Sequence, residues 1–244
     1  MKSIIYGALL FALVACNSAD SGTTAGTQTE GTSTASDTGT AAANTETNST
    51  APAAQPVQKE QSMSEYQDQV AVVKTSAGEI EIRFFPDVAP NHVKNFIDLA
   101  KQGFYNGTKF HRVIPGFMIQ GGDPNTKSGD PMTWGMGGSP NKVRAEFNSV
   151  PHNRGIVSMA RSQDPNSASS QFFICVADAG FLDNNYTAFG QVLKGMDVAD
   201  KIVSAKTGPQ DRPLEPTTIE SITFRAATDA EKGAAPQKGS APAQ

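Results

Sequence analysis

The chain has 244 residues, with 20 Lys and Arg against 24 Asp and Glu, so its formal net charge is −4 at pH 7. Its basic residues form no cluster that would predict a nucleic-acid partner. The three histidines, His92, His111 and His152, lack the spacing of metal ligands, and we expect no metal and no other cofactor. Cys175, within FFIC, is expected to pack as a small apolar side chain.

Residues 1–16 predict a signal peptide, because Lys2 precedes the apolar run Ile4–Val14, which is too short to cross a bilayer as a helix. The run ends in LVAC, which resembles a bacterial lipobox. We therefore expect Cys16 to be lipid-modified and to anchor the protein to a membrane. An ordinary signal peptide with an incidental Cys16 is the alternative. Asn17 favours the outer membrane, with the protein on the periplasmic side or at the cell surface.

The rest of the chain divides into three parts. Residues 17–65 are rich in Ser, Thr and Ala and lack aromatic residues, so we expect a disordered tether. Residues 66–225 suit one folded domain with a single core. Residues 226–244, rich in Ala, Gly, Lys, Gln and Pro, predict a second disordered tail.

The folded part is expected to begin with a β-hairpin and a helix. VAVVKT at 70–75 and EIEIRF at 79–84 flank a turn at 76–78, and the second run alternates apolar with charged residues. Pro90 suits the first turn of a helix, and Gly103 suits its end. Between them, four apolar residues share one helical face: Val93, Phe96, Ile97 and Ala100.

Further along, two short strands are expected around the Pro115-Gly116 turn, followed by a Gly-rich loop at 121–138. A second helix is expected at about 197–205. The remaining strands are expected near 143–145, 155–159, 171–176, 188–193 and 218–224. Many short strands with two helices indicate a mainly β fold, a closed antiparallel barrel with helical plugs, because closure removes exposed strand edges.

The most informative stretch is FHRVIPGFMIQGGDP at 110–124, which sets Arg112 and Gln120 among apolar residues. A cation in apolar surroundings is costly unless it has a partner or a task. Because no acid, base, nucleophile or metal set stands beside it, the pattern indicates chemistry by one hydrogen-bond donor and an apolar pocket.

This stretch and several later blocks make the chain resemble the cyclophilin-type peptidyl-prolyl isomerases over about residues 70–224. The other blocks are GIVSMA at 155–160, SSQFFI at 169–174, LD at 182–183, FGQV at 189–192 and GMD at 195–197. The resemblance implies a closed eight-stranded antiparallel barrel capped by two α-helices, with the active site on its outer face. It also implies a monomer that acts on proline-containing polypeptides.

The resemblance assigns roles to individual residues. Arg112, Gln120 and Phe173 would form the catalytic set, with Arg112 donating to the prolyl nitrogen and Gln120 holding the preceding carbonyl. Peptide contacts would come from His111, Phe117, Met118, Ala160, Arg161, Phe181, Leu182 and Tyr186. Without the resemblance, Arg112 would more often pair with a distant acid, and the apolar members would be core. His111 is more often structural.

Three positions depart from the eukaryotic members of the family. Phe181 stands where they have a tryptophan that binds cyclosporin, so drug sensitivity is open. Tyr186 replaces a histidine at the rim. Arg161 replaces an asparagine, and we hypothesise that it favours acidic client segments. Trp134, in the 125–141 loop, is expected to pack across the loop base rather than form a lid.

The expected function is therefore isomerisation of Xaa-Pro bonds in periplasmic or surface proteins. A non-catalytic module that holds proline-containing segments is the first alternative. A surface protein projected by the tether toward another cell is the second.

Overall fold

The computed structural model describes residues 66, 68–233, 235 and 236, so the predicted signal peptide, Cys16 and the tether up to residue 65 lie outside the described residues. The described part contains two α-helices, α2 (Pro90–Lys101) and α3 (Met196–Val203). None of its helices is long and apolar enough to span a membrane. The strands are β1 (Gln69–Thr75), β2 (Gly78–Phe84), β3 (Arg112–Ile114), β4 (Met118–Gly121), β5 (Ile156–Met159), β6 (Phe172–Cys175), β7 (Ala188–Lys194) and β8 (Ile219–Ala226).

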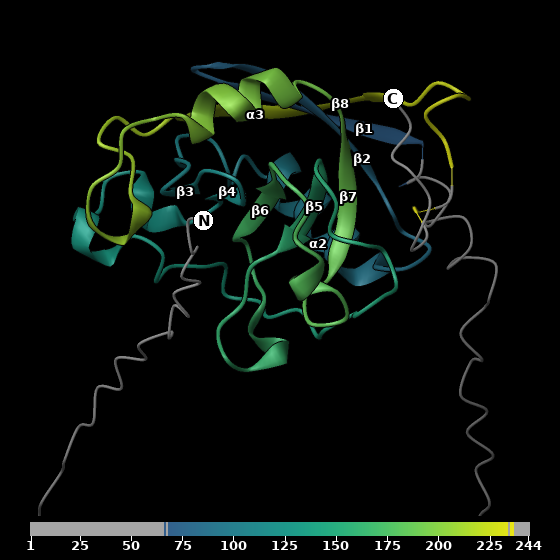
Figure 1. The fold of residues 1–244 in the computed structure, drawn as a ribbon. Coiled ribbons are helices and arrows are strands. Elements are labelled where there is room, and N and C mark those ends of the chain that lie inside the picture. The colour runs from purple at the N-terminus through teal and green to yellow at the C-terminus, as the bar shows by residue number, and fades with distance from the viewer. Residues whose placement is uncertain (1–65, 67, 234, 237–244) are drawn as a thin grey trace, which may run out of the picture. The chain divides into compact units, whose positions relative to one another are not determined.

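These eight strands form one antiparallel sheet in the order β3-β4-β6-β5-β7-β2-β1-β8 (Figure 1). The mainly β prediction is confirmed, but the prediction of a closed barrel is wrong. The sheet curls into a half-barrel with β3 and β8 as its edges. Between these edges lies one isolated bridge, Lys109 to Thr218, in place of a ladder.

Two glycines explain why the edges do not pair fully. Gly103 and Gly107 have φ of 69° and 81°, so the chain before β3 turns repeatedly and cannot extend along β8. Single backbone bonds cross the gap instead: Gly107 donates to the carbonyl of Ile219 at 2.8 Å, and Phe110 donates to that of Thr217 at 3.0 Å.

The predicted hairpin is present, with β1 and β2 joined by Ser76 and Ala77. Ile80, Ile82 and Phe84 are buried, as their alternation predicts. Gly78 at the turn, with φ of 143°, makes room for α3, because a Cβ there would lie 2.7 Å from Cγ2 of Val198. Figure 1 shows α3 across one end of the curled sheet.

The main core lies between the inner face of the sheet and α2. All four predicted apolar positions of α2 are buried. Phe96, fully buried, has ring centroids of four other aromatic residues within 5.7 Å: Phe84, Tyr105, Phe172 and Phe189. Such mutual contacts add to the free energy gained from the buried area and hold the sheet around the helix.

The strand expected at 143–145 is absent, and this prediction is wrong. Val143 makes only an isolated bridge to Ala168. The segment is fixed instead by Glu146, whose carboxylate accepts hydrogen bonds from the backbone N–H groups of Asn91 and His92 at 3.1 and 3.0 Å. These are free N–H groups at the start of α2, which has no side-chain cap of its own.

The described residues after 225 pack on the domain, whereas the sequence predicted a disordered tail there. Arg225 donates to both carboxylate oxygens of Glu231 at 2.7 and 2.8 Å, and the ammonium of Lys232 is 3.1 Å from Asp68. Ala235 is buried in a small cluster with Phe85, Val150, Ile156 and Ala188. Composition alone misses these contacts because they depend on partners far away in the sequence.

Candidate active site

The predicted catalytic residues form a row across the outer face of the sheet. Arg112 in β3 is paired with Gln120 in β4, and Gln120 with Phe173 in β6. The next residue in the row is Ser158 in β5, paired with Phe173. Since opposite residues of an antiparallel ladder lie about 4.5–5.5 Å apart, the sheet brings these side chains to one place.

An apolar cluster separate from the main core adjoins this row. Its buried members include Met118, Phe173 and Leu182, with Phe117 and Tyr186 partly buried against them. The strand alternation explains the separation, because the neighbours Ile119, Phe172 and Ile174 face the main core instead. The predicted walls of a proline pocket thus meet on the outer face.

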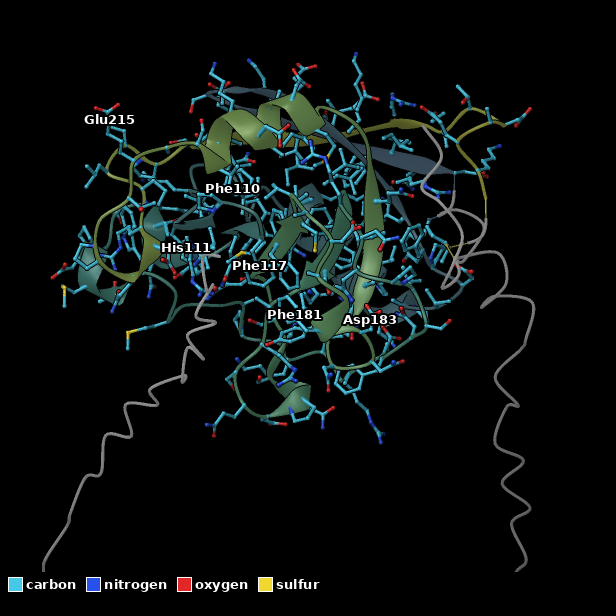
Figure 2. All side chains as sticks on the ribbon, viewed as in Figure 1. Phe110, His111, Phe117, Phe181, Asp183 and Glu215 are labelled. Carbon is cyan, nitrogen blue, oxygen red and sulfur yellow. The ribbon has the colours of Figure 1, made fainter. Side chains whose placement is uncertain are left out.

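The rim of this cluster is more open than its floor. Phe181 is 70% exposed, and its ring centroid lies 5.2 Å from that of Phe117. The Tyr186 ring meets Phe173 edge-on at 5.8 Å. Figure 2 shows His111, Phe117, Phe181 and Asp183 following one another across the view. An apolar ring such as that of proline would meet a buried floor here and an exposed aromatic edge.

Gln120 is held by a second glutamine, Gln171, which the sequence analysis did not single out. The Gln120 amide donates to Oε1 of Gln171 at 2.8 Å. Gln171 in turn donates to the carbonyls of Gly135 and Gly137 at 2.9 and 2.7 Å. Because the Gln171 amide is bonded on both sides, it fixes the orientation of Gln120.

The loop behind Gln171 is built on a buried carboxylate, that of Asp123. It accepts from the backbone N–H of Asn125 at 2.8 Å and from those of Gly135 and Gly137. A Cβ at Gly137 would lie 2.2 Å from Oδ1 of Asp123, so only glycine fits. Trp134 donates across the loop to the Gly129 carbonyl at 3.2 Å. Trp134 also lines a hollow beside His111 and Arg112.

A buried polar chain supports Phe173 from behind. His152 stacks on the Phe173 ring at 6.3 Å between centroids. Its Nδ1 lies 3.0 Å from Asp183 and its Nε2 lies 3.1 Å from the hydroxyl of Ser158, which donates to the Thr187 carbonyl. Burial lowers the pKa of His152, although Asp183 opposes the shift. The ring is therefore held at both nitrogens while it packs on Phe173.

Arg112 has an acidic partner, Asp211, whose Oδ2 lies 3.4 Å from Nε. The Arg112 side chain is 34% exposed and that of Asp211 is 49% exposed. Asp211 and the preceding Gln210 have φ of 55° and 63°. Such a conformation costs a non-glycine residue about 1–2 kcal/mol, whereas an exposed ion pair contributes about 0.2–1 kcal/mol.

His111 is buried, and neither of its ring nitrogens has a hydrogen-bond partner among the described residues. Burial lowers the pKa of His111. Its backbone N–H donates to the Gln120 carbonyl at 3.0 Å, so it holds β3 against β4. The alternative of a structural role agrees with this position.

Arg161 and Ala160 lie at the other end of the row. The guanidinium of Arg161 donates to the carbonyls of Asn185, Ser162 and Gln163 and lies 4.6 Å from the centroid of the Tyr186 ring. Its donors are therefore used within the domain. The Ala160 N–H donates to the Gln171 carbonyl at 2.9 Å, so a peptide contact there would use the Ala160 carbonyl.

Two hollows in the surface meet at Gln120, Gly135 and Met136. The first extends past Ala160, Arg161, Ser169 and Gln171, and also includes Gly137, Lys142, Ser162 and Ser167. The second extends past His111 and Arg112 to Trp134 and the turn at 210–212. Together they form a groove that runs from the turn at 210–212 past Gln120 to Arg161.

The groove favours non-covalent chemistry. Burial raises the pKa of the Cys175 thiol to about 12, so this nearby cysteine does not supply a thiolate nucleophile. The guanidinium of Arg112, which lines the second hollow, is a permanent cation and hydrogen-bond donor. The arrangement therefore suits the stabilisation of a developing lone pair beside an apolar ring.

Sequence reasoning missed Gln171, Asp183, His152 and Asp211. The first was recoverable, because Gln171 lies two residues before Phe173 and so shares its face. Asp211 was not, because it lies 99 positions from Arg112 on an irregular segment without a recognisable pattern.

Comparison with known proteins identifies the family. The family model described as "Cyclophilin type peptidyl-prolyl cis-trans isomerase/CLD" matches residues 70–224. Peptidyl-prolyl cis-trans isomerase A of Dickeya dadantii is 47% identical over 163 residues, which are 62% of this chain and 81% of the relative. Peptidyl-prolyl cis-trans isomerase B of Escherichia coli is 45% identical over 164 residues, 61% of this chain and 95% of the relative.

A solved structure is similar as well. It is the crystal structure of a Cryptosporidium parvum cyclophilin-type isomerase in the presence of the dipeptide Ala-Pro. It aligns with a TM-score of 0.59 and 29% identity over 65% of this chain and 99% of that one. Given the fold, the apolar cluster and Arg112 in the adjoining row, the chain belongs to the cyclophilin-type family and is a peptidyl-prolyl cis-trans isomerase.

Proposed function

We propose that Arg112 accelerates rotation about the Xaa-Pro bond of a bound polypeptide by donating a hydrogen bond to the prolyl nitrogen. Rotation meets a barrier of about 18–20 kcal/mol because it breaks amide resonance. As the amide twists, its nitrogen regains a lone pair, which a planar ground-state amide does not offer. A donor that meets only the twisted state lowers the barrier without stabilising the substrate.

The pocket and Gln120 supply the remaining requirements. The buried floor of Met118, Phe173 and Leu182 holds the proline ring and excludes water, which strengthens a hydrogen bond from the adjacent guanidinium. Gln120, oriented by Gln171, holds the carbonyl before the proline. One end of the amide is then fixed while the other turns. The observation that carries this proposal is the pairing of Arg112, Gln120 and Phe173 in adjacent strands.

The experiment is a protease-coupled isomerisation assay on a chromogenic Xaa-Pro tetrapeptide. Arg112→Ala should lower kcat/KM by about 10²–10³-fold, as expected for loss of one preorganised donor. Arg154→Ala is the matched control, because Arg154 also pairs with an acid, Asp200, but lies outside the groove. A wild-type rate equal to the uncatalysed one would overturn the activity. Full activity of Arg112→Ala would overturn the mechanism alone.

We also propose that the isomerase works on periplasmic or surface proteins while anchored through Cys16. The support is the LVAC sequence after an apolar run and the tether that follows it. The described fold begins beside Gln69, which pairs with Ala226, at the end of β1 away from the Thr75–Ile219 pair. A seven-residue strand spans roughly 20–25 Å, so Gln69 lies well away from the Thr75 end of β1.

Mass spectrometry of the membrane fraction tests the anchor. The mature N-terminal peptide should begin at an acylated Cys16, and Cys16→Ser should release the protein into the soluble fraction. Recovery of an unmodified N-terminus beyond Cys16 would overturn the anchor and leave the isomerase proposal standing.

A further inference from the structure

The segment between α3 and β8 brings an acidic side chain to Arg112. Asp211 lies in the short 3-10 helix η5 (Pro209–Asp211), and its Oδ2 is 3.4 Å from Nε of Arg112. Both residues line the same hollow, together with Trp134 and Arg212. Of the guanidinium nitrogens, Nε is the one with a hydrogen-bond partner among the described residues, so both Nη groups stay available.

The turn that carries Asp211 is strained, and it is held in place. Gln210 and Asp211 are consecutive residues with φ near +60°, a region that favours glycine. Gly208 donates to the Arg212 carbonyl at 2.8 Å, and the Arg212 guanidinium bonds the Gln210 side chain at 2.9 Å while lying 5.6 Å from the Trp134 ring centroid. An exposed ion pair returns less free energy than this strain costs, so the Arg112–Asp211 pair does not by itself account for the turn.

We propose that Asp211 is a positioning residue that sets the orientation of the Arg112 guanidinium. A carboxylate at Nε restricts rotation of the end of the side chain and leaves the two Nη groups directed to the groove. Its negative charge also lowers the free energy of holding a cation beside an apolar pocket. The inference rests on the proposed role of Arg112 as the donor.

The test compares Asp211→Asn with wild type. Asparagine tolerates a positive φ, so the turn is retained while the charge is lost. We expect kcat to fall about fivefold with KM nearly unchanged, because the donor acts in the transition state. Glu215→Gln is the matched control, an exposed acid on the same segment that Figure 2 shows pointing away from the site, and it should leave both constants unchanged.

A double-mutant cycle separates positioning from a general structural effect. Lysine has no Nε–H donor fork, so in an Arg112→Lys background the Asp211→Asn change should have no further effect on kcat. Raising the salt concentration should lower kcat of wild type toward that of Asp211→Asn and leave the variant unaffected, since the exposed pair is screened.

Two outcomes would overturn the proposal. One is an unchanged kcat in Asp211→Asn while Arg112→Ala remains inactive. The other is the same loss from Asp211→Asn in both backgrounds, which would make the effect independent of Arg112. Both outcomes presuppose an active wild type, which the comparison of the wild-type rate with the uncatalysed rate decides separately.

Discussion

Each polar side chain at the centre of the groove is oriented by a residue behind it. Gln120 depends on Gln171, and Arg112 lies against Asp211. Long side chains lose considerable rotational entropy when they are fixed. Because these side chains are already oriented, substrate binding does not include that entropy loss. The groove is therefore set up before a peptide arrives.

The contribution of Gln171 can be measured directly. Gln171→Leu removes its hydrogen bonds to Gln120, Gly135 and Gly137, and we expect kcat/KM to fall by about 3–10-fold. Gln102→Leu, at the exposed C-cap of α2, is the control and should match wild type. Equal values of kcat/KM for Gln171→Leu and wild type would show that Gln120 needs no such support.

The residues found from the sequence and those missed differ in one physical respect. Arg112, Gln120 and Phe173 stand in strands whose alternation and pairing can be read along the chain. Asp211 stands on an irregular turn that no periodicity describes, and its place depends on the packing of Arg212 on Trp134. Contacts between loops therefore escape sequence reasoning even where both loops are near the site.

At the scale of elements, hairpins and helices follow local patterns closely. α2 begins at Pro90 and ends before Gly103, as expected, and β2 buries its apolar alternate residues. Two predictions were wrong, the closed barrel and the strand at 143–145. Both features depend on partners that are distant in sequence. The relevant partners are β8 for the edge strand β3 and the N-terminus of α2 for Glu146.

The segment 227–236 should stabilise the domain without serving catalysis. A chain that ends at Ala226 loses the Arg225–Glu231 pair, the bond from the Ala227 N–H to the Asp68 carbonyl and the buried Ala235. Exposed pairs contribute little and one backbone hydrogen bond about 1 kcal/mol, so we expect its free energy of unfolding to fall by about 1–3 kcal/mol.

Urea unfolding followed by the fluorescence of Trp134 measures this difference, with a chain ending at Pro236 as the reference. The isomerase rate per folded molecule should be the same for both, because Figure 1 shows the segment on the opposite side of the view from β3 and β4. A lower rate in the shorter chain would connect the segment to the groove.

For the whole molecule, the buried histidines make stability depend on pH. Burial lowers the pKa of both His111 and His152, while in the unfolded chain both take up protons near pH 6.5. Their effect on stability is therefore absent above that pH. Below it the unfolded state binds more protons than the native state, and stability falls by up to about 1.4 kcal/mol per pH unit for each histidine.

Urea unfolding at pH 7.0, 6.5 and 5.5 should show this loss. His111→Phe fills the same buried site without a titrating ring, so its stability should fall by roughly 1 kcal/mol less between pH 6.5 and 5.5. Arg225 lowers the pKa of Glu231 to about 2. Such carboxylates lose their stabilising effect only below the pH range of this experiment, so they do not obscure the comparison. Parallel curves for both proteins would exclude His111 as the source.

The pairing of β1 with β8 affects how the domain folds during synthesis. Val70 lies opposite Arg225. Val70 is synthesised early, so this edge of β1 can pair only after nearly the whole domain has been made. At about 5–20 residues per second, the outer edge of β1 stays unpaired for roughly 10–30 s of synthesis. Pairing strands that are so far apart in sequence also slows folding. Until β8 is made, this unpaired edge is open to pairing with another chain, so the domain is exposed to aggregation during synthesis.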